Sequence, residues 1–238
     1  NAGFNMATVL PAWNWTGNVP GGWAAIDSVL GISALDQLGY RVKAHGAVWL
    51  QRHGILPERA FRLSPSDLST QLLTHFEQLV DAYADQVDLW EVMNEPATTN
   101  EVGMPRQQVI TLLRDATRVV KEQDPEAPTL VNGVHEFDFG RKYTLFGLDN
   151  NPVNDYPMTY SAFLREARNA DALDQVDIIG LQFYPGFHLN EKFGGLEGPA
   201  MPPSALIDMI SRYAALFDKP IHITECSLPS TYGYDLEA

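Results

Sequence analysis

Short apolar runs alternate with longer amphipathic stretches along this chain. The runs are apolar at successive positions, the pattern of parallel strands that are covered by helices on both faces. They comprise residues 4–9, 41–49, 87–93, 129–132, 176–182 and 221–225. Each run is short enough for a strand. The pattern therefore predicts six buried strands.

The stretches between these runs predict helices. Ser64 is placed to cap a helix that begins with Pro65 and carries Asp67 in its first turn. An apolar stripe with helical spacing follows, formed by Leu68, Leu72, Phe76, Leu79 and Tyr83. Pro105 opens the next helix, and further helices are expected over 24–38, 160–172 and 203–217. Gly39 is expected to end the first of these.

The order of these elements is a repeat of strand and helix, which indicates a parallel α/β sheet, either a barrel or a doubly wound sheet. No Gly-x-Gly-x-x-Gly follows the first strand, and this weakens a dinucleotide-binding interpretation. Polar residues gather at the carboxyl ends of at least five strands, as a barrel active site requires. The 238 residues show no interdomain linker or internal repeat, so 1–238 is expected to be one domain.

Two strands end in a glutamate. The run 87–93 leads directly into Asn94, Glu95 and Pro96, and the last run ends at Glu225. Hydrolysis of a glycosidic bond needs an acid for the leaving oxygen and a carboxylate for the oxocarbenium-like carbon. A buried acid next to a second carboxylate can keep its proton near neutral pH. The pair predicts glycosidase chemistry, against the alternative of exposed strand ends or helix caps.

Composition narrows the range of partners. The formal net charge is −14, which argues against nucleic acid or an anionic membrane as the main partner. The single Cys226 excludes an intramolecular disulfide and a cysteine-based zinc site. No apolar run reaches about 18 residues, so no membrane span is predicted. Metal-binding and P-loop motifs are absent from the sequence, and no cofactor is expected.

Several motifs in order resemble glycoside hydrolase family 10, the retaining endo-β-1,4-xylanases on a (β/α)8 TIM barrel. Residues 90–95 are similar to its Trp-Asp-Val-Val-Asn-Glu signature, and 43–49 to its strand-three pattern Arg-Gly-His-Thr-Leu-Val-Trp. Residues 176–182 resemble the strand six that ends in Gly-Leu-Gln, and 222–225 resemble the nucleophile strand. Phe4, Asn5 and Trp15 resemble strand two and its loop.

The resemblance implies roles for individual residues. Glu95 would be the acid/base and Glu225 the nucleophile, with Asn94 contacting the sugar 2-hydroxyl. The implied substrate-binding residues are Asn94, His45, Trp49, Gln182, Tyr184 and Trp15. From the residues alone, His45 could equally be a core histidine, Trp49 a packing residue and Gln182 a partner of strand-end backbone. The expected ligand is a β-linked polysaccharide or oligosaccharide, most readily xylan.

The chain also departs from the family pattern. Residues 9–15 lack the Glu and Lys of the family's strand-two loop, Leu50 replaces a His, and Tyr184 stands at the place of the strand-six His. These changes affect substrate binding more than the two carboxylates. A retaining enzyme for another β-glycan, such as glucan or mannan, is therefore one alternative. A non-catalytic carbohydrate-binding protein or an inactive fragment is the other.

The matched motifs run from the family's strand two to its strand seven. The resemblance thus predicts a TIM barrel that lacks strand 1 and strand 8 in this chain. The first residues, Asn1 to Phe4, read like the interior of a protein, and no signal peptide is seen. We expect a processed or truncated chain, and the resemblance implies a secreted or extracellular protein. Oligomeric state has no signal in the sequence.

Overall fold

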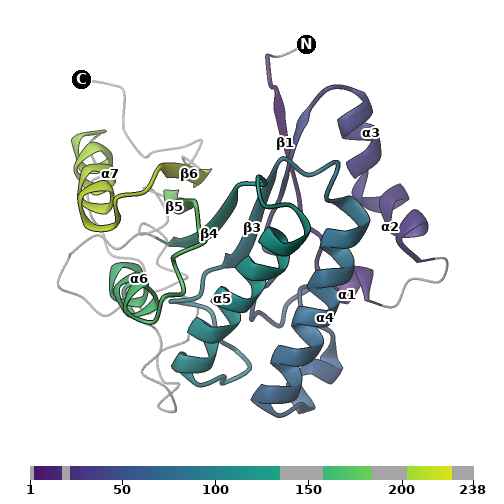
Figure 1. The fold of residues 1–238 in the computed structure, drawn as a ribbon, viewed down its shortest axis with the longest axis horizontal. Coiled ribbons are helices and arrows are strands. Elements are labelled where there is room, and N and C mark those ends of the chain that lie inside the picture. The colour runs from purple at the N-terminus through teal and green to yellow at the C-terminus, as the bar shows by residue number, and fades with distance from the viewer. Residues whose placement is uncertain (1–2, 18–21, 135–157, 184–202, 227–238) are drawn as a thin grey trace, which may run out of the picture.

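A computed structural model describes residues 3–17, 22–134, 158–183 and 203–226 of the chain. The described strands form one parallel sheet in the order β1-β2-β3-β4-β5-β6, so that each strand pairs with its neighbours in sequence (Figure 1). Their bounds are Met6–Val9, Arg41–Ala44, Leu89–Asn94, Thr129–Val134, Ile178–Phe183 and Ile221–Cys226. Every predicted apolar run overlaps one of these strands. The fold is α/β, with six parallel strands in the arrangement of part of a TIM barrel.

Helices connect successive strands and pack on the sheet. They are α1 Trp13–Thr16, α2 Gly22–Leu30, α3 Ile32–Gln37, the 3-10 helix η1 Glu58–Arg62, α4 Pro65–Tyr83, α5 Arg106–Gln123, α6 Tyr160–Asn169 and α7 Pro203–Phe217. Helix α3 contacts β2, α5 contacts β3 and β4, and α7 contacts β6. Figure 1 shows α4 and α5 side by side, and the two helices are in contact. Among the described residues, no helix combines the length and apolar character needed to cross a bilayer.

Helix α4 forms as its sequence predicts. The Ser64 hydroxyl accepts a hydrogen bond from the Asp67 backbone N–H at 3.2 Å, which satisfies a free donor of the first turn. The stripe facing the sheet is buried, with Leu68, Leu72 and Phe76 each 1% exposed. Burial of such an apolar stripe, at about 1.5–3 kcal/mol for each large side chain, is what holds the helix on the sheet.

Two predicted elements are shorter in the structure because glycines turn the chain. The expected helix over 24–38 is divided into α2 and α3 at Gly31, which has a left-handed φ of 71°. The expected strand over 41–49 ends at Ala44, because Gly46 has a φ of 61°. A positive φ is accessible to glycine at little cost, and it is incompatible with a continuous helix or strand.

A buried histidine joins α4 to the first helices. The ring of His75 stacks between Trp13 and Trp23, with ring centroids 5.7 Å from each. Its Nε2 lies 2.8 Å from the hydroxyl oxygen of Thr16. Burial, with a smaller contribution from the Arg59 charge, lowers the pKa of His75 to about 4. The neutral imidazole is therefore the form that this cluster accommodates.

We expect the protein to lose stability in mild acid through His75. Because the folded pKa of about 4 lies below the ordinary 6.5, protonation favours the unfolded chain. The contribution is complete above about pH 6.5 and is lost as the pH falls towards 4. A loss on the order of 3 kcal/mol follows from a shift of this size. Urea unfolding at pH 7 and at pH 4.5 measures it.

The control for this prediction is His75→Gln, which keeps a hydrogen-bonding group near Thr16 but does not titrate. Carboxylates titrate over the same range in both proteins, so only the difference between the two pH dependences reports on His75. The variant is expected to show the weaker dependence. Equal dependences would contradict the prediction.

Candidate active site

A β-bulge precedes each of the two candidate glutamates. The pairing of β3 with β4 shifts between Glu91 and Met93, and the pairing of β5 with β6 shifts at Gln182, which pairs with Glu225. One extra residue in a strand reverses the side to which the following side chains point. Glu91 and Asn94, three residues apart, therefore both reach Asn132. The bulges thus aim the ends of β3 and β6 at the same space.

Gln182 at the end of β5 connects the two glutamates. Its Nε2 lies 3.0 Å from Oε1 of Glu95 and 3.0 Å from Oε1 of Glu225. Because each oxygen lies 3.0 Å from the same nitrogen, the two oxygens are separated by at most twice this N···O distance. Carboxyl groups of retaining glycosidases lie about 5–5.5 Å apart, whereas those of inverting enzymes lie about 6.5–9.5 Å apart. The bound on the two oxygens is compatible with the retaining spacing.

Asn132 in β4 is a central residue of the site that the sequence reading did not identify. Its Nδ2 donates to Oδ1 of Asn94 at 2.8 Å and to Oε1 of Glu225 at 2.8 Å. Its Oδ1 accepts from the hydroxyl of Thr224. Gly180 makes room for this amide, since a Cβ there would lie 2.9 Å from Asn132 Oδ1. The sequence does contain one signal for Asn132: it is an amide at the end of an apolar run, and this run is the next one along the chain after that of Glu95.

Behind the glutamates lies a buried group of charges. Lys43 and Glu91 are 4% and 0% exposed, and Lys43 Nζ lies 2.9 Å from Glu91 Oε2. Glu91 Oε1 lies 2.8 Å from Nδ1 of His45 and 3.2 Å from the donating backbone N–H of Gly46. The left-handed turn at Gly46 directs that N–H towards the carboxylate. Glu91 therefore fixes the segment that follows β2.

His45 lies between Glu91 and the candidate nucleophile. Its Nε2 is 3.6 Å from Oε1 of Glu225. Burial opposes protonation of the ring, but the hydrogen bond to Glu91 and the charges of Glu91 and Glu225 outweigh it and raise the pKa of His45. A protonated His45 offers a positive charge and a donor on the Glu225 side. In the sequence, only the family resemblance of residues 43–49 pointed to His45. In the structure, His45 lies beside Glu225.

Glu95 has an unusual backbone and a defined carboxyl environment. Its φ is 52°, which is rare for a residue other than glycine, and its N–H donates to the Asn132 carbonyl at 2.8 Å. The Thr99 hydroxyl donates to Oε2 at 2.6 Å. Burial is the largest influence on this carboxyl, and with the Glu225 charge it raises the pKa of Glu95 against the hydrogen bonds from Thr99 and Gln182. A carboxyl of this kind can act as an acid near neutral pH.

The remaining predicted site residues differ in position. Asn94 is 1% exposed and its Nδ2 has no acceptor among the described residues. The Trp49 ring meets His45 edge-on, with centroids 6.0 Å apart. Trp15 lies in α1 and is 47% exposed, and among the described contacts none joins it to either glutamate. Tyr184 lies outside the described residues. The structure thus gathers Glu95, Glu225, Asn94, His45 and Gln182, with Trp49 beside them.

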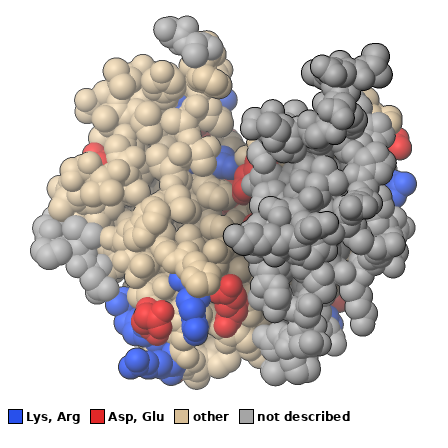
Figure 2. All heavy atoms as spheres, turned by 180° about the vertical axis from the view of Figure 1, so that it is seen from behind, with Lys and Arg blue, Asp and Glu red and all other residues tan. Residues whose placement is uncertain are grey.

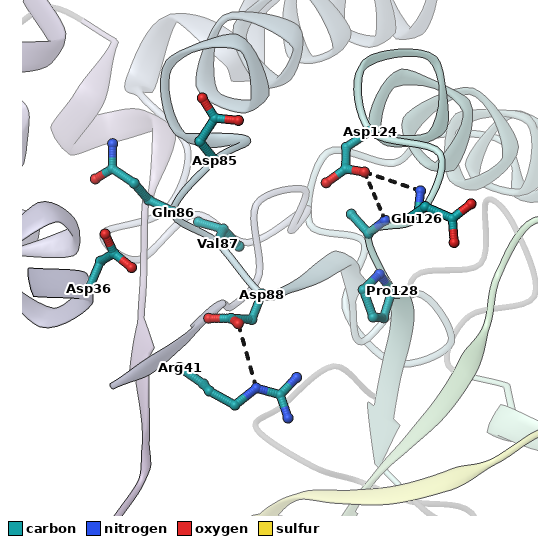
Figure 3. Close-up of a pocket in the computed structure, with 10 residues that line it drawn as sticks. Asp36, Arg41, Asp85, Gln86, Val87, Asp88, Asp124, Glu126 and Pro128 are labelled. Atoms are coloured by element: carbon teal, nitrogen blue, oxygen red, sulfur yellow. Dashed lines mark hydrogen bonds and ion pairs between the residues drawn. The ribbon is translucent and has the colours of Figure 1, made fainter. Parts of the chain in front are cut away.

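A separate hollow of about 340 Å³ lies at the amino ends of β2, β3 and β4, the opposite end of the strands from the glutamates (Figure 3). Two of its carboxylates, Asp88 and Asp124, serve the local fold. Asp88 pairs with Arg41 at 3.5 Å and accepts from the Val42 N–H at 2.7 Å, and Asp124 accepts from the N–H groups of Glu126 and Ala127. Within the described segments, no three His, Cys, Asp or Glu side chains converge to hold a metal ion.

Comparison with known proteins gives one family model that matches part of the chain. Residues 22–133 match the model of glycosyl hydrolase family 10, a range that includes His45, Asn94, Glu95 and Asn132. No curated protein matches the chain in sequence.

Solved structures match the fold over nearly the whole chain. A thermostable mutant of a xylanase, Xyn10A, from Cellvibrio japonicus has 18% identity and a TM-score of 0.62, covering 99% of this chain and 64% of that one. A family-10 xylanase from Thermobacillus composti has 18% identity and a TM-score of 0.58, covering 96% and 62%. A psychrophilic family-10 endo-β-1,4-xylanase has 20% identity and a TM-score of 0.60, covering 94% and 66%.

This chain therefore spans less than two thirds of each of these three structures. The strand order, the family match over 22–133 and the shared fold all agree with the motifs read from the sequence. The resemblance to glycoside hydrolase family 10 is thereby confirmed: residues 22–133 match the family's sequence model, and the described fold matches part of the barrel in solved family-10 structures.

Proposed function

We propose that this protein is a retaining glycoside hydrolase that cleaves internal β-1,4 linkages of a plant-type polysaccharide, most readily xylan. One observation carries the proposal: a single amide, Gln182 Nε2, lies 3.0 Å from a carboxylate oxygen of both Glu95 and Glu225. Two carboxyl groups this close can work on the same anomeric carbon. The family match and the family-10 fold support the same reaction class.

Each glutamate has a distinct environment that suits a distinct role. Glu225 accepts from Asn132 and Gln182 and faces His45, so its carboxylate is held in a fixed orientation that suits a nucleophile. Glu95 is the buried partner with a raised pKa, suited to hold the proton for the leaving oxygen. In the first step Glu225 attacks the anomeric carbon as Glu95 protonates the departing oxygen. In the second, Glu95 takes a proton from water, which hydrolyses the glycosyl-enzyme.

Asn94 is proposed to bind the sugar hydroxyl next to the reacting carbon. Its Oδ1 accepts from Asn132 at 2.8 Å and from Gln182 at 3.2 Å, so the oxygen is already occupied. Its Nδ2 is left as a donor without an acceptor in the described residues. Such a buried donor costs free energy unless a ligand accepts from it. A sugar hydroxyl would supply that acceptor.

The substrate is proposed to be a neutral polymer. The formal net charge of −14 disfavours polyanions. Figure 2 shows the face turned away from α4 and α5, where the described charged side chains gather mainly along the lower edge and most of the described surface is uncharged. A long neutral glycan can lie on such a surface without desolvating many charges. Because such a polymer does not enter cells, we propose that the protein is secreted. We also propose that residues 1–238 belong to one catalytic domain.

A second candidate is hydrolysis of another β-glycan, such as glucan or mannan. It is favoured by residues 9–15, where the family's strand-two Glu and Lys are missing. A third is carbohydrate binding without turnover; the chain spans 61–66% of several of the family-10 structures that it matches. In that case, glycan binding measured by calorimetry would be unchanged in Glu225→Ala.

The proposal predicts covalent labelling of Glu225. A 2-fluoro xylobioside with a good leaving group is expected to form a stable glycosyl ester. The fluorine slows both steps of the reaction, and the good leaving group keeps formation of the ester faster than its hydrolysis. Peptide mass spectrometry would locate the label. A panel of xylan, β-glucan and mannan with a reducing-sugar readout separates the substrates. Absence of labelling together with release of products of inverted configuration would contradict the retaining mechanism.

A further inference from the structure

Thr99 belongs to a tight turn that returns the chain to the side chain of Glu95. The Thr99 N–H donates to the Glu95 carbonyl at 2.9 Å, and its hydroxyl donates to Glu95 Oε2 at 2.6 Å. Thr99 is only 7% exposed. The turn begins at Glu95, which has a left-handed φ of 52°. The hydroxyl therefore reaches the carboxyl through the local backbone and does not depend on a long, flexible side chain.

The next residue anchors the turn on its other side. Asn100 forms a parallel bridge with Leu50, and its side chain donates to the Met104 carbonyl at 2.7 Å and accepts from the Met104 N–H at 3.0 Å. Asn100 is 6% exposed, so these bonds are shielded from water. Thr99 is thus held between two fixed points, Glu95 and Asn100. A hydroxyl held in this way can orient a carboxyl with little loss of side-chain entropy.

The two oxygens of Glu95 have partners of different chemistry. Oε1 faces Gln182 Nε2 at 3.0 Å, and this amide nitrogen can only donate. Its orientation is fixed, because the same nitrogen also lies near the acceptors Asn94 Oδ1 and Glu225 Oε1. Oε2 faces a hydroxyl, which can donate to a carboxylate or accept from a carboxylic acid. A proton on Oε1 would oppose an N–H, whereas a proton on Oε2 has an acceptor.

We propose that Thr99 is a positioning residue for the acid/base Glu95, which it orients through the turn and whose proton it assigns to Oε2. The inference deepens the proposed function and rests on it for the role of Glu95. In the acid form, Oε2 carries the hydrogen and Thr99 Oγ1 accepts from it. When the proton passes to the leaving oxygen, the Thr99 hydroxyl rotates and donates to the new carboxylate. The proton returns to Oε2 from water in the second step.

Other groups near the Glu95 carboxyl also affect its ionisation. Glu225, on β6, opposes ionisation of Glu95, and His45, after β2, favours it. The neighbours from β4 and β5, Asn132 and Gln182, do not titrate. Among these groups Thr99 is distinct in that its hydrogen bond can reverse direction with the protonation state. Removing its hydroxyl therefore removes a partner of both forms, and the stronger loss falls on the carboxylate.

The test is the titration of Glu95 by NMR with ¹³C-labelled glutamate carboxyls, assigned by the signal lost in Glu95→Gln. In Thr99→Val, which keeps the shape and lacks the hydroxyl, the pKa of Glu95 is expected to rise. Thr99→Ser restores the hydroxyl and is expected to return the titration towards that of the unchanged protein. If Thr99→Val does not fold, as judged by circular dichroism, Thr99→Ala carries the same test.

Thr98→Val is the matched control. Thr98 lies in the same turn, and its buried hydroxyl has no partner among the described residues, so its removal should leave Glu95 unchanged. No shift in Thr99→Val, or an equal shift in Thr98→Val, would overturn the proposal. This readout needs no turnover. An inactive protein with the expected titration would refute the proposed hydrolysis and leave the role of Thr99 intact.

If the protein is active, kinetics give a second readout. Loss of one charge-assisted hydrogen bond corresponds to roughly a tenfold change in a rate or equilibrium constant. Thr99→Val is expected to lower kcat/KM about tenfold for a substrate with a poor leaving group, and to move the basic limb of its pH profile upward. For an aryl glycoside with a good leaving group the loss should be small, because little proton transfer is needed. Equal losses on both substrates would indicate a merely structural role.

Discussion

Glu225→Gln is expected to lower kcat for a β-xyloside substrate by about 10⁴-fold or more, the scale on which loss of a covalent nucleophile acts in hydrolases. The amide cannot form the glycosyl ester of the first step. Its oxygen can still accept from Asn132 and Gln182, which now donate to Oε1 of Glu225 at 2.8 and 3.0 Å. The fold should therefore be retained. Steady-state kinetics with an aryl xylobioside, together with thermal unfolding, measure both properties.

Glu95→Gln is the comparison that separates the two roles. Loss of a general acid lowers the rate by about 10²–10⁴-fold, and most for leaving groups that need protonation. We expect this variant to lose most of its activity on xylan and to keep the first step on an activated aryl glycoside. Glu225→Gln should lose both. A Glu225→Gln protein that retains a tenth of the activity would contradict the assignment of the nucleophile.

Lys43→Met is expected to lower the free energy of unfolding by about 3–5 kcal/mol, the cost of leaving one partner of a buried ion pair without the other. Lys43 Nζ lies 2.9 Å from Glu91 Oε2, and the side chains are 5% and 0% exposed. Without the ammonium, Glu91 loses the partner of its Oε2 and keeps donors from His45, Gly46 and Asn132, all on Oε1. Urea unfolding at pH 7 measures the loss of stability. This loss arises from the Lys43–Glu91 pair and does not require any change at Glu95 or Glu225.

The chain offers a matched control on its surface. Arg118 and Glu122 lie 3.7 Å apart on α5, with side chains 57% and 67% exposed. Arg118→Met should cost less than about 1 kcal/mol, because exposed pairs contribute little. In the double variant Lys43→Met with Glu91→Gln, the buried charge is removed as well, and the loss should be smaller than the sum of the single losses. A Lys43→Met protein as stable as Arg118→Met would show that the buried pair contributes nothing.

Strand positions were predictable because the signal for them is local. A short run whose central residues are apolar at successive positions, such as 129–132 or 176–182, marks a strand buried on both faces wherever it stands in the chain. The cap at Ser64 and the stripe behind it are equally local, and α4 follows them closely. The breaks at Gly31 and Gly46 were not foreseen, because a glycine permits a left-handed turn without requiring one.

The two glutamates could also be found from the sequence, since a carboxylate that ends an apolar strand has few uses in packing. The roles assigned to them and to Asn94, His45, Trp49, Gln182, Tyr184 and Trp15 remain predictions. Trp15 is 47% exposed and has no described contact with the glutamates or with Asn132, Gln182 and His45 beside them, and Tyr184 lies outside the described residues.

The sequence by itself determined six parallel strands, the helices between them and a glutamate at the end of two strands, because periodicity and capping act over a few residues. Tertiary structure alone decided how those glutamates meet. Gln182 and Asn132 reach both β3 and β6 only through the register of neighbouring strands, and the two bulges set the side to which Asn94 and Glu225 point. Hydrogen-bond distances between strands far apart in the chain depend on that register, which no local pattern encodes.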